Sequence, residues 1–197
     1  LQDAAPAAKT KGVVLDLRSN PGGLITAAVD VADEFLPDVL IVSVKGRNAL
    51  SNASYFGKPG QQFSGVPVVV LIDAGSASAS EILAGALQDH KRATLMGSRS
   101  FGKGSVQNVI YLDNGDAFKL TTARYYTPDG RSIQAQGIVP EILLQGNAKA
   151  GFTEKDLPKH IKAGTDSGLQ AEAGVVLGGE AYIGKALAYL KQQETKP

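Results

Sequence analysis

Apolar runs and helical segments alternate along the first half of the chain. Nearly continuous apolar runs cover residues 12–17, 39–44, 66–72 and 93–96, which is the pattern of strands buried on both faces. Apolar residues at helical spacing lie between them, over residues 25–36 and 80–87. Strands that alternate with helices in this way predict the α/β fold class with a mainly parallel sheet.

The middle of the chain has the signals of β-hairpins. Strand-like segments at residues 106–112 and 117–122 flank Asp113-Asn114-Gly115, a strong hairpin turn. Residues 46–65 are polar and rich in glycine, which indicates a loop or a further hairpin.

The two ends of the chain suggest a single domain cut from a longer protein. Residues 1–10 resemble the end of an Ala-rich helix, so we expect a truncated N-terminal helix there, followed by a core over residues 11–144. Residues 145–179 are polar with little periodicity and are expected to form a surface loop. Apolar positions over residues 180–193 predict a terminal amphipathic helix.

Composition narrows the chemistry. The chain has 197 residues and a formal net charge of +1, without a basic run, so nucleic acid is not an expected partner. It has no cysteine, which excludes a thiol nucleophile, a disulfide framework and a cysteine-ligated metal. The two histidines, His90 and His160, are too far apart in sequence to suggest a metal site. No apolar stretch reaches the roughly 18 residues that a transmembrane helix needs.

A serine cluster follows the third apolar run, at the expected start of a helix. Ser76, Ser78 and Ser80 lie where a strand end and a helix N-terminus can present a nucleophile to free N–H groups. The competing interpretation is a capping box, with Ser78 as the N-cap and Glu81 three residues later. The segment is not a G-x-S-x-G elbow, because Ser76 and Ser80 stand where glycines are needed.

Lys103 lies between two glycines downstream of this cluster. The pattern Gly97-x-x-x-x-Gly102-Lys103 matches most of a phosphate-binding P-loop, but Gly104 replaces the Ser or Thr that reaches magnesium, and a strand-like segment follows in place of a helix. The alternative is a lysine general base, which must be buried enough to lose its proton. The flanking glycines suggest closely packed backbone and a lysine held in a defined direction.

Two further segments have both a structural and a functional interpretation. His90 beside Asp89 allows a Ser-His-Asp triad, but cationic residues at a helix C-terminus are also expected there, and we favour that helix-end role. The turn Asn20-Pro21-Gly22-Gly23 is either a simple tight turn or a source of backbone N–H groups for a ligand or an oxyanion.

Taken together, four segments resemble the C-terminal processing peptidases, also called tail-specific proteases. They occur in that family's order and cover about two-thirds of the chain: residues 11–23 (KGVVLDLRSNPGG), 75–82 (GSASASEI), 100–107 (SFGKGSVQ) and 125–140 (YYTPDGRSIQAQGIVP).

The resemblance implies a Clp protease/crotonase-like core and assigns roles to the site residues. Ser78 is the expected nucleophile of a serine endopeptidase, Lys103 its general base, and Gln107 the residue that orients the lysine. The expected oxyanion donors are the N–H of Ala79 and one from Gly22 or Gly23. No metal or other cofactor is implied.

The resemblance also implies partners. The substrates are expected to be proteins or peptides with flexible C-termini, processed outside the cytoplasm, in the bacterial periplasm or cell envelope. Family members carry a PDZ domain before the catalytic core, and this chain lacks one. The natural substrate and the oligomeric state stay open. Two rival hypotheses are a nucleotide-binding module on the Gly97–Lys103 loop and a catalytically silent interaction scaffold.

Overall fold

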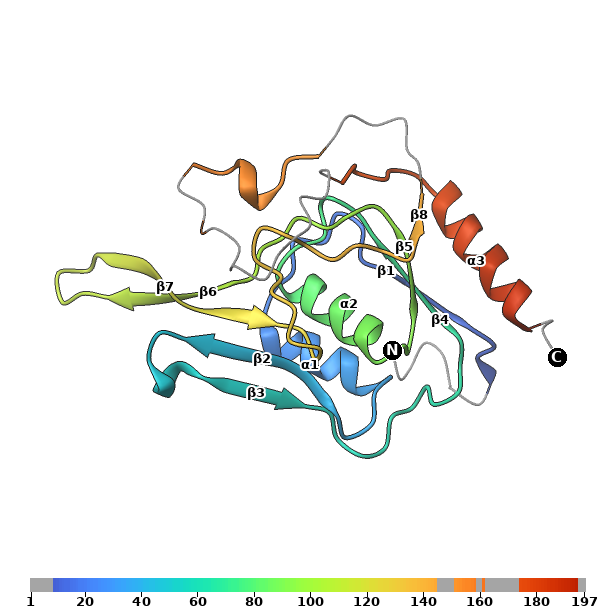
Figure 1. Cartoon of the computed structure of the whole chain (residues 1–197), viewed down its shortest axis with the longest axis horizontal. Coiled ribbons are helices and arrows are strands. Elements are labelled where there is room, and N and C mark those ends of the chain that lie inside the picture. Colours follow the sequence, from blue (N-terminus) through green and yellow to red (C-terminus); the bar gives the residue numbers. More distant parts are fainter. Residues whose placement is uncertain (1–8, 145–150, 159–160, 162–173, 195–197) are drawn as a thin grey trace.

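The computed structural model describes residues 9–144, 151–158, 161 and 174–194 (Figure 1). The helix expected over residues 1–10 therefore lies almost entirely outside the described residues. The strands are β1 (Val13–Asp16), β2 (Leu40–Gly46), β3 (Ala53–Phe56), β4 (Val68–Ile72), β5 (Thr94–Gly97), β6 (Ser105–Tyr111), β7 (Ala117–Tyr126) and β8 (Ile142–Leu143). The helices are α1 (Ile25–Asp33), α2 (Ala79–Asp89) and α3 (Ala181–Glu194), with short 3₁₀ turns at Ala49–Ser51 and Glu154–Asp156.

A four-stranded parallel sheet in the order β1-β4-β5-β8 forms the centre of the molecule. Every residue of β4 is buried, because its two faces are both covered. Val68, Val70 and Ile72 pack in the cluster that includes α1 and α2, whereas Val69 and Leu71 pack in a second cluster with α3. The α/β class and the buried run at residues 66–72 are as the sequence predicts.

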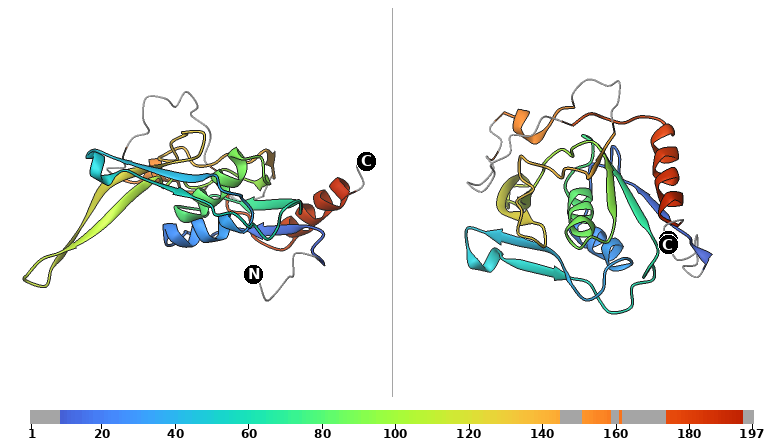
Figure 2. Two further views of the ribbon diagram at one scale, coloured as in Figure 1. Left: turned by 90° about the horizontal axis from the view of Figure 1, so that it is seen from below. Right: turned by 45° about the vertical axis from the view of Figure 1, so that its right-hand side comes forward.

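A second, antiparallel sheet in the order β3-β2-β7-β6 lies beside the first. The strand expected at residues 39–44 belongs to this sheet and not to the parallel one, which corrects the simple alternation suggested by the sequence. An apolar run predicts burial but does not identify the neighbouring strand, and here β2 pairs with β7 from far along the chain. The predicted hairpin at Asp113–Gly115 is present, and β6 and β7 project from the body as a long arm (Figures 1 and 2).

The C-terminal part of the chain packs more closely than the sequence predicts. The surface loop expected over residues 145–179 includes, in its described part, Gly174 and Leu177, which are both buried. Leu177 packs with Leu71 of β4 and Ala186 of α3 in the second cluster. The terminal helix predicted at residues 180–193 corresponds to α3, which covers β1 and β4 (Figure 2).

Candidate active site

The serine cluster occupies the loop between β4 and α2, and its three serines differ in exposure. Ser76 is fully buried: its Oγ donates to the Leu17 carbonyl at 2.7 Å and accepts from the Asp73 N–H at 3.0 Å. Ser80 is buried in the first turn of α2, whereas Ser78 is partly exposed. Of the three, Ser78 is therefore the serine that a substrate can reach.

Ser78 has a strained backbone. Its φ of 57° and ψ of −115° lie in a sparsely populated region, which costs a residue other than glycine on the order of 1–3 kcal/mol. The expected capping box supports it, because the Ser78 N–H donates to Glu81 Oε2 at 2.8 Å and the N–H groups of Glu81 and Ile82 bind the Ser78 carbonyl. The next residue, Ala79, begins the helix, where N–H groups lack intrahelical partners and the dipole is positive.

The carboxylate of Glu81 joins the serine loop to the lysine loop. Its Oε2 accepts from the N–H groups of Ser78 and Lys103, both at 2.8 Å. Its Oε1 accepts from Ser100 Oγ at 2.6 Å and from the Gly102 N–H at 2.7 Å. Burial raises the pKa of Glu81 from 4.5 to about 7, although these hydrogen bonds favour the charged form. Because one oxygen binds both residues, the backbone nitrogens of Ser78 and Lys103 lie close together.

Packing of the lysine loop explains its glycines. A Cβ on Gly104 would lie 2.3 Å from the backbone nitrogen of Gln134, and the Gly104 N–H donates to Gln134 Oε1 at 3.0 Å. Gly102 has a φ of +97°, which other residues rarely adopt. The loop continues into β6 and not into a helix. Both findings oppose a P-loop, because there is no room for its Ser or Thr at position 104 and no helix N-terminus to hold phosphate.

Gln107 lies beyond an irregularity in β6. The strand begins at Ser105, and its register to β7 shifts between Val106 and Gln107. Gln107 is exposed, and among the described residues no hydrogen bond joins it to Lys103. The argument that residues four apart on a strand share a face therefore does not apply here, and the role of Gln107 stays a prediction.

His90 has the helix-end role that we favoured. It is the C-cap of α2, and its Nε2 lies 2.7 Å from the Leu40 carbonyl. Twelve residues of helical rise separate it from Ser78, or roughly 18 Å. The neighbouring Asp89 pairs with Arg131. The structure thus gives no support to a Ser-His-Asp triad with these residues, and His160 lies outside the described residues.

The glycine turn after β1 lies directly against the serine loop. A Cβ on Gly22 would lie 2.5 Å from the Ala77 carbonyl oxygen and 2.7 Å from the Ala79 nitrogen, and Gly22 has a φ of +91°. The Gly22 N–H donates to Asn20 Oδ1 at 2.9 Å, and the Ala77 N–H donates to the Asn20 carbonyl at 3.0 Å. In the described part of the chain, the Gly23 N–H has no such acceptor.

An apolar cavity of about 330 Å³ adjoins this turn. Gly22 and Gly23 line one part of it, and Ala79 and Ser80 at the start of α2 line another. Its remaining lining is mainly aliphatic, from β1, α1 and α2: Leu15, Leu17, Asn20, Leu24, Ala27, Ala28, Val31 and Leu83. The cavity is large enough for a small apolar side chain next to Ser78.

Within the described ranges, no group of three or more His, Cys, Asp or Glu residues could hold a metal ion. No helix in the same ranges is long and apolar enough to cross a membrane.

Comparison with known proteins identifies the family. Residues 1–144 match peptidase family S41. The chain belongs to peptidase family S41. The S41 chain is 48% identical to the carboxy-terminal-processing protease of Bartonella bacilliformis over 174 residues, which are 85% of this chain and 40% of that protein. It is 39% identical to the carboxyl-terminal-processing protease of Synechocystis sp. over 175 residues, which are 89% of this chain and 39% of the relative.

A solved structure supports the same assignment. The photosystem II D1 C-terminal processing protease superimposes with a TM-score of 0.64 at 41% identity, covering 68% of the S41 chain and 34% of that structure. The resemblance inferred from the four motifs and the α/β fold class are therefore confirmed. The S41 chain spans about two-fifths of the length of these curated relatives.

The sequence did not reveal which residues hold the site loops. Glu81 was interpreted only as a helix cap, and Asp73 and Gln134 were not considered. Asp73 did carry a signal, since an acidic residue directly after a fully apolar strand must find partners if it is buried. Gln134 lies in a motif segment, but no periodicity marks it as the side chain that binds Gly104.

Proposed function

We propose that the S41 chain is the catalytic core of a serine endopeptidase that uses a Ser78–Lys103 pair. The observation that carries this proposal is the shared Glu81 oxygen, which holds the backbone of both residues at one point of the site. Partial exposure of Ser78 beside buried Ser76 and Ser80 supports the same choice of nucleophile.

The chemistry begins with Lys103 in its neutral form. Its Nζ takes the proton from Ser78 Oγ, which attacks the carbonyl carbon of the scissile peptide bond. The tetrahedral intermediate collapses to an acyl-enzyme, and the lysine ammonium returns its proton to the departing amine. Water, deprotonated in turn by Lys103, then releases the acyl group and regenerates the serine.

The oxyanion of the tetrahedral intermediate needs preorganised N–H donors. We assign the N–H of Ala79 as one donor, because it opens α2 next to the nucleophile. We assign the N–H of Gly23 as the other, because Asn20 already accepts from the Gly22 N–H. Gly22 then has a packing role, since any side chain would collide with Ala79.

The substrates that fit this site are extended chains with small apolar side chains near the cleaved bond. The aliphatic cavity beside Gly22 and Ala79 offers such a side chain a place. Relatives bear names that describe carboxy-terminal processing, which supports flexible C-terminal regions of proteins as the substrate class. We further propose that the full-length protein carries a PDZ domain before this core and acts outside the cytoplasm.

The test compares hydrolysis of an unstructured peptide by the wild type, Ser78→Ala and Lys103→Ala. Both variants should be folded and inactive. Ser76→Ala is the comparison variant: it should be less stable, because a buried hydroxyl with two partners is lost, but it should keep the nucleophile. Full activity in Ser78→Ala would contradict the proposal. A wild-type chain that is inert toward both peptides and a serine-directed acylating probe would favour the scaffold hypothesis.

A further inference from the structure

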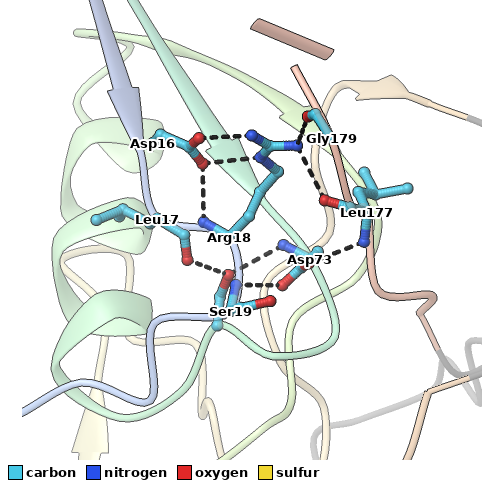
Figure 3. Close-up of polar contacts among 8 residues, drawn as sticks. Asp16, Leu17, Arg18, Ser19, Asp73, Leu177 and Gly179 are labelled. Carbon is cyan, nitrogen blue, oxygen red and sulfur yellow. Dashed lines mark hydrogen bonds and ion pairs between the residues drawn. The ribbon is translucent and has the colours of Figure 1, made fainter. Parts of the chain in front are cut away.

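Asp73, the first residue after β4, is a buried carboxylate that binds three separate segments (Figure 3). Its Oδ1 accepts from the Ser19 N–H at 2.8 Å and from the Gly75 N–H at 2.9 Å. Its Oδ2 accepts from the Leu177 N–H at 2.9 Å. Ser19 precedes the glycine turn, Gly75 begins the serine loop, and Leu177 comes from the C-terminal part of the chain, so one side chain connects all three.

The site around Asp73 is built to hold a negative charge. A buried carboxylate is costly unless hydrogen bonds or an opposite charge compensate it. Besides the three N–H donors, the guanidinium of Arg18 lies nearby, and Asp16 and Asp73 both raise its pKa. Arg18 pairs with Asp16 and donates to the carbonyls of Leu177 and Gly179 at 2.9 and 2.8 Å (Figure 3). The C-terminal segment is thus fastened through both its N–H and its carbonyl groups.

The Ser19 contact bears on the proposed oxyanion hole. Ser19 has a φ of 53°, a left-handed conformation that is uncommon outside glycine. Its Cα would lie 2.7 Å from a Cβ on Gly75, so the two loops touch at this point. Asn20 follows directly and binds both the Gly22 N–H and the Ala77 N–H. The hydrogen bond from Ser19 to Asp73 therefore fixes the start of the turn that carries the proposed donor.

We propose that Asp73 is a positioning residue that fixes the Asn20–Gly23 turn relative to Ser78, and that the segment Val175–Gly179 forms part of the same anchor. The Ala74 N–H donates to the Val175 carbonyl at 3.2 Å, which ties this segment to the serine loop a second time. The kinetic consequence rests on the proposed Ser/Lys peptidase function, whereas the structural anchor does not.

The kinetic test uses a pair of small activated acyl substrates, an ester and its thionoester, on the chain described here. Thiocarbonyl sulfur is a weaker hydrogen-bond acceptor than carbonyl oxygen, so the ester depends more on the oxyanion donors. We expect Asp73→Ala to lower the ester rate by about 100-fold, the order of effect of losing one such donor. The ester-to-thionoester rate ratio should fall with it. The ratio does not depend on the folded fraction, which separates misplacement of the donors from simple unfolding.

Two variants sharpen the comparison. Asp16→Ala is the matched control: it removes the partly exposed partner of Arg18 but leaves the three N–H bonds to Asp73, so the ratio should stay within about twofold of the wild type. Asp73→Asn should be intermediate, because its amide oxygen can serve Ser19 and Gly75 while its NH₂ faces the Leu177 N–H. An unchanged ratio in Asp73→Ala would overturn the positioning role.

Hydrogen exchange tests the anchor without any catalysis. In Asp73→Ala the amides of Ser19 and Leu177 should exchange at least tenfold faster, whereas amides in the middle of β4, such as Val70, should change much less. Equal exchange of Ser19 in the wild type and the variant would contradict the anchor. If the wild type shows neither ester hydrolysis nor acylation but Ser19 responds as expected, the proposed function fails and the anchor stands.

Discussion

Replacement of Glu81 by glutamine perturbs the site at the atom that joins its two loops. In the wild type, Oε2 accepts from the N–H groups of Ser78 and Lys103, and Oε1 accepts from Ser100 and Gly102. Glutamine keeps one acceptor oxygen and turns an NH₂ toward two donors, so one pair of bonds is lost. Each buried donor left unsatisfied costs about 1–3 kcal/mol. We expect Glu81→Gln to lower kcat by more than tenfold with a smaller change in KM.

The same substitution changes how stability depends on pH. The Glu81 pKa rises from 4.5 to about 7 in the folded protein, so the folded state keeps a proton that the unfolded state has already released in this range. The stability that this proton provides is fully present below pH 4.5 and is lost as pH rises through 7. The shift corresponds to about 3 kcal/mol of unfolding free energy. Glutamine does not titrate, so the variant lacks this contribution.

The assay is denaturant unfolding of the wild type and of Glu81→Gln at several pH values from 4 to 9. The unfolding free energy of the wild type relative to the variant should fall by about 3 kcal/mol across this range. Activity of the wild type should rise over the same range, because the ionised carboxylate can accept all four hydrogen bonds. A relative stability that does not vary with pH, or wild-type kcat in the variant, would refute the reasoning.

Three further predictions follow from the site. His90→Ala should keep most of the activity, because His90 caps the far end of α2; a loss on the order of 10⁴-fold, as for a broken triad, would revive the histidine mechanism. Chelators should leave hydrolysis unchanged, and inhibition by EDTA that zinc reverses would contradict a Ser78–Lys103 mechanism. This chain alone should cut a disordered tail with a free apolar C-terminus and its amidated form at similar rates; a strong preference in direct competition would show that the core itself recognises the terminus.

Local patterns were sufficient where the structure depends on neighbours in sequence. The apolar run of β4 predicts burial on both faces, and Asp113-Asn114-Gly115 predicts the β6–β7 hairpin, because each depends on residues close in sequence. The strand order is different, since β2 pairs with β7 across about 80 positions and nothing local specifies it. The short β8 is likewise specified by its neighbour β5.

The site was predictable as residue types but not as a mechanical arrangement. The motifs indicated Ser78 and Lys103, and the structure places their loops together. They did not indicate that Glu81 links the loops, because the same residue also satisfies an ordinary capping box. Nor did they indicate Asp73, whose third partner, Leu177, lies in a segment that polarity marked as a surface loop. Contacts between distant segments decide both cases.

The most direct test of the Ser78–Lys103 mechanism is the site and rate of acylation. The wild type, Lys103→Ala and Lys103→Arg are incubated with an acylating active-site probe, and the labelled peptide is identified by mass spectrometry. The account predicts one acyl group on Ser78 in the wild type and little or none in either variant, because alanine lacks a base and arginine stays protonated. Acylation at another residue, or full labelling of Ser78 in Lys103→Arg, would contradict it.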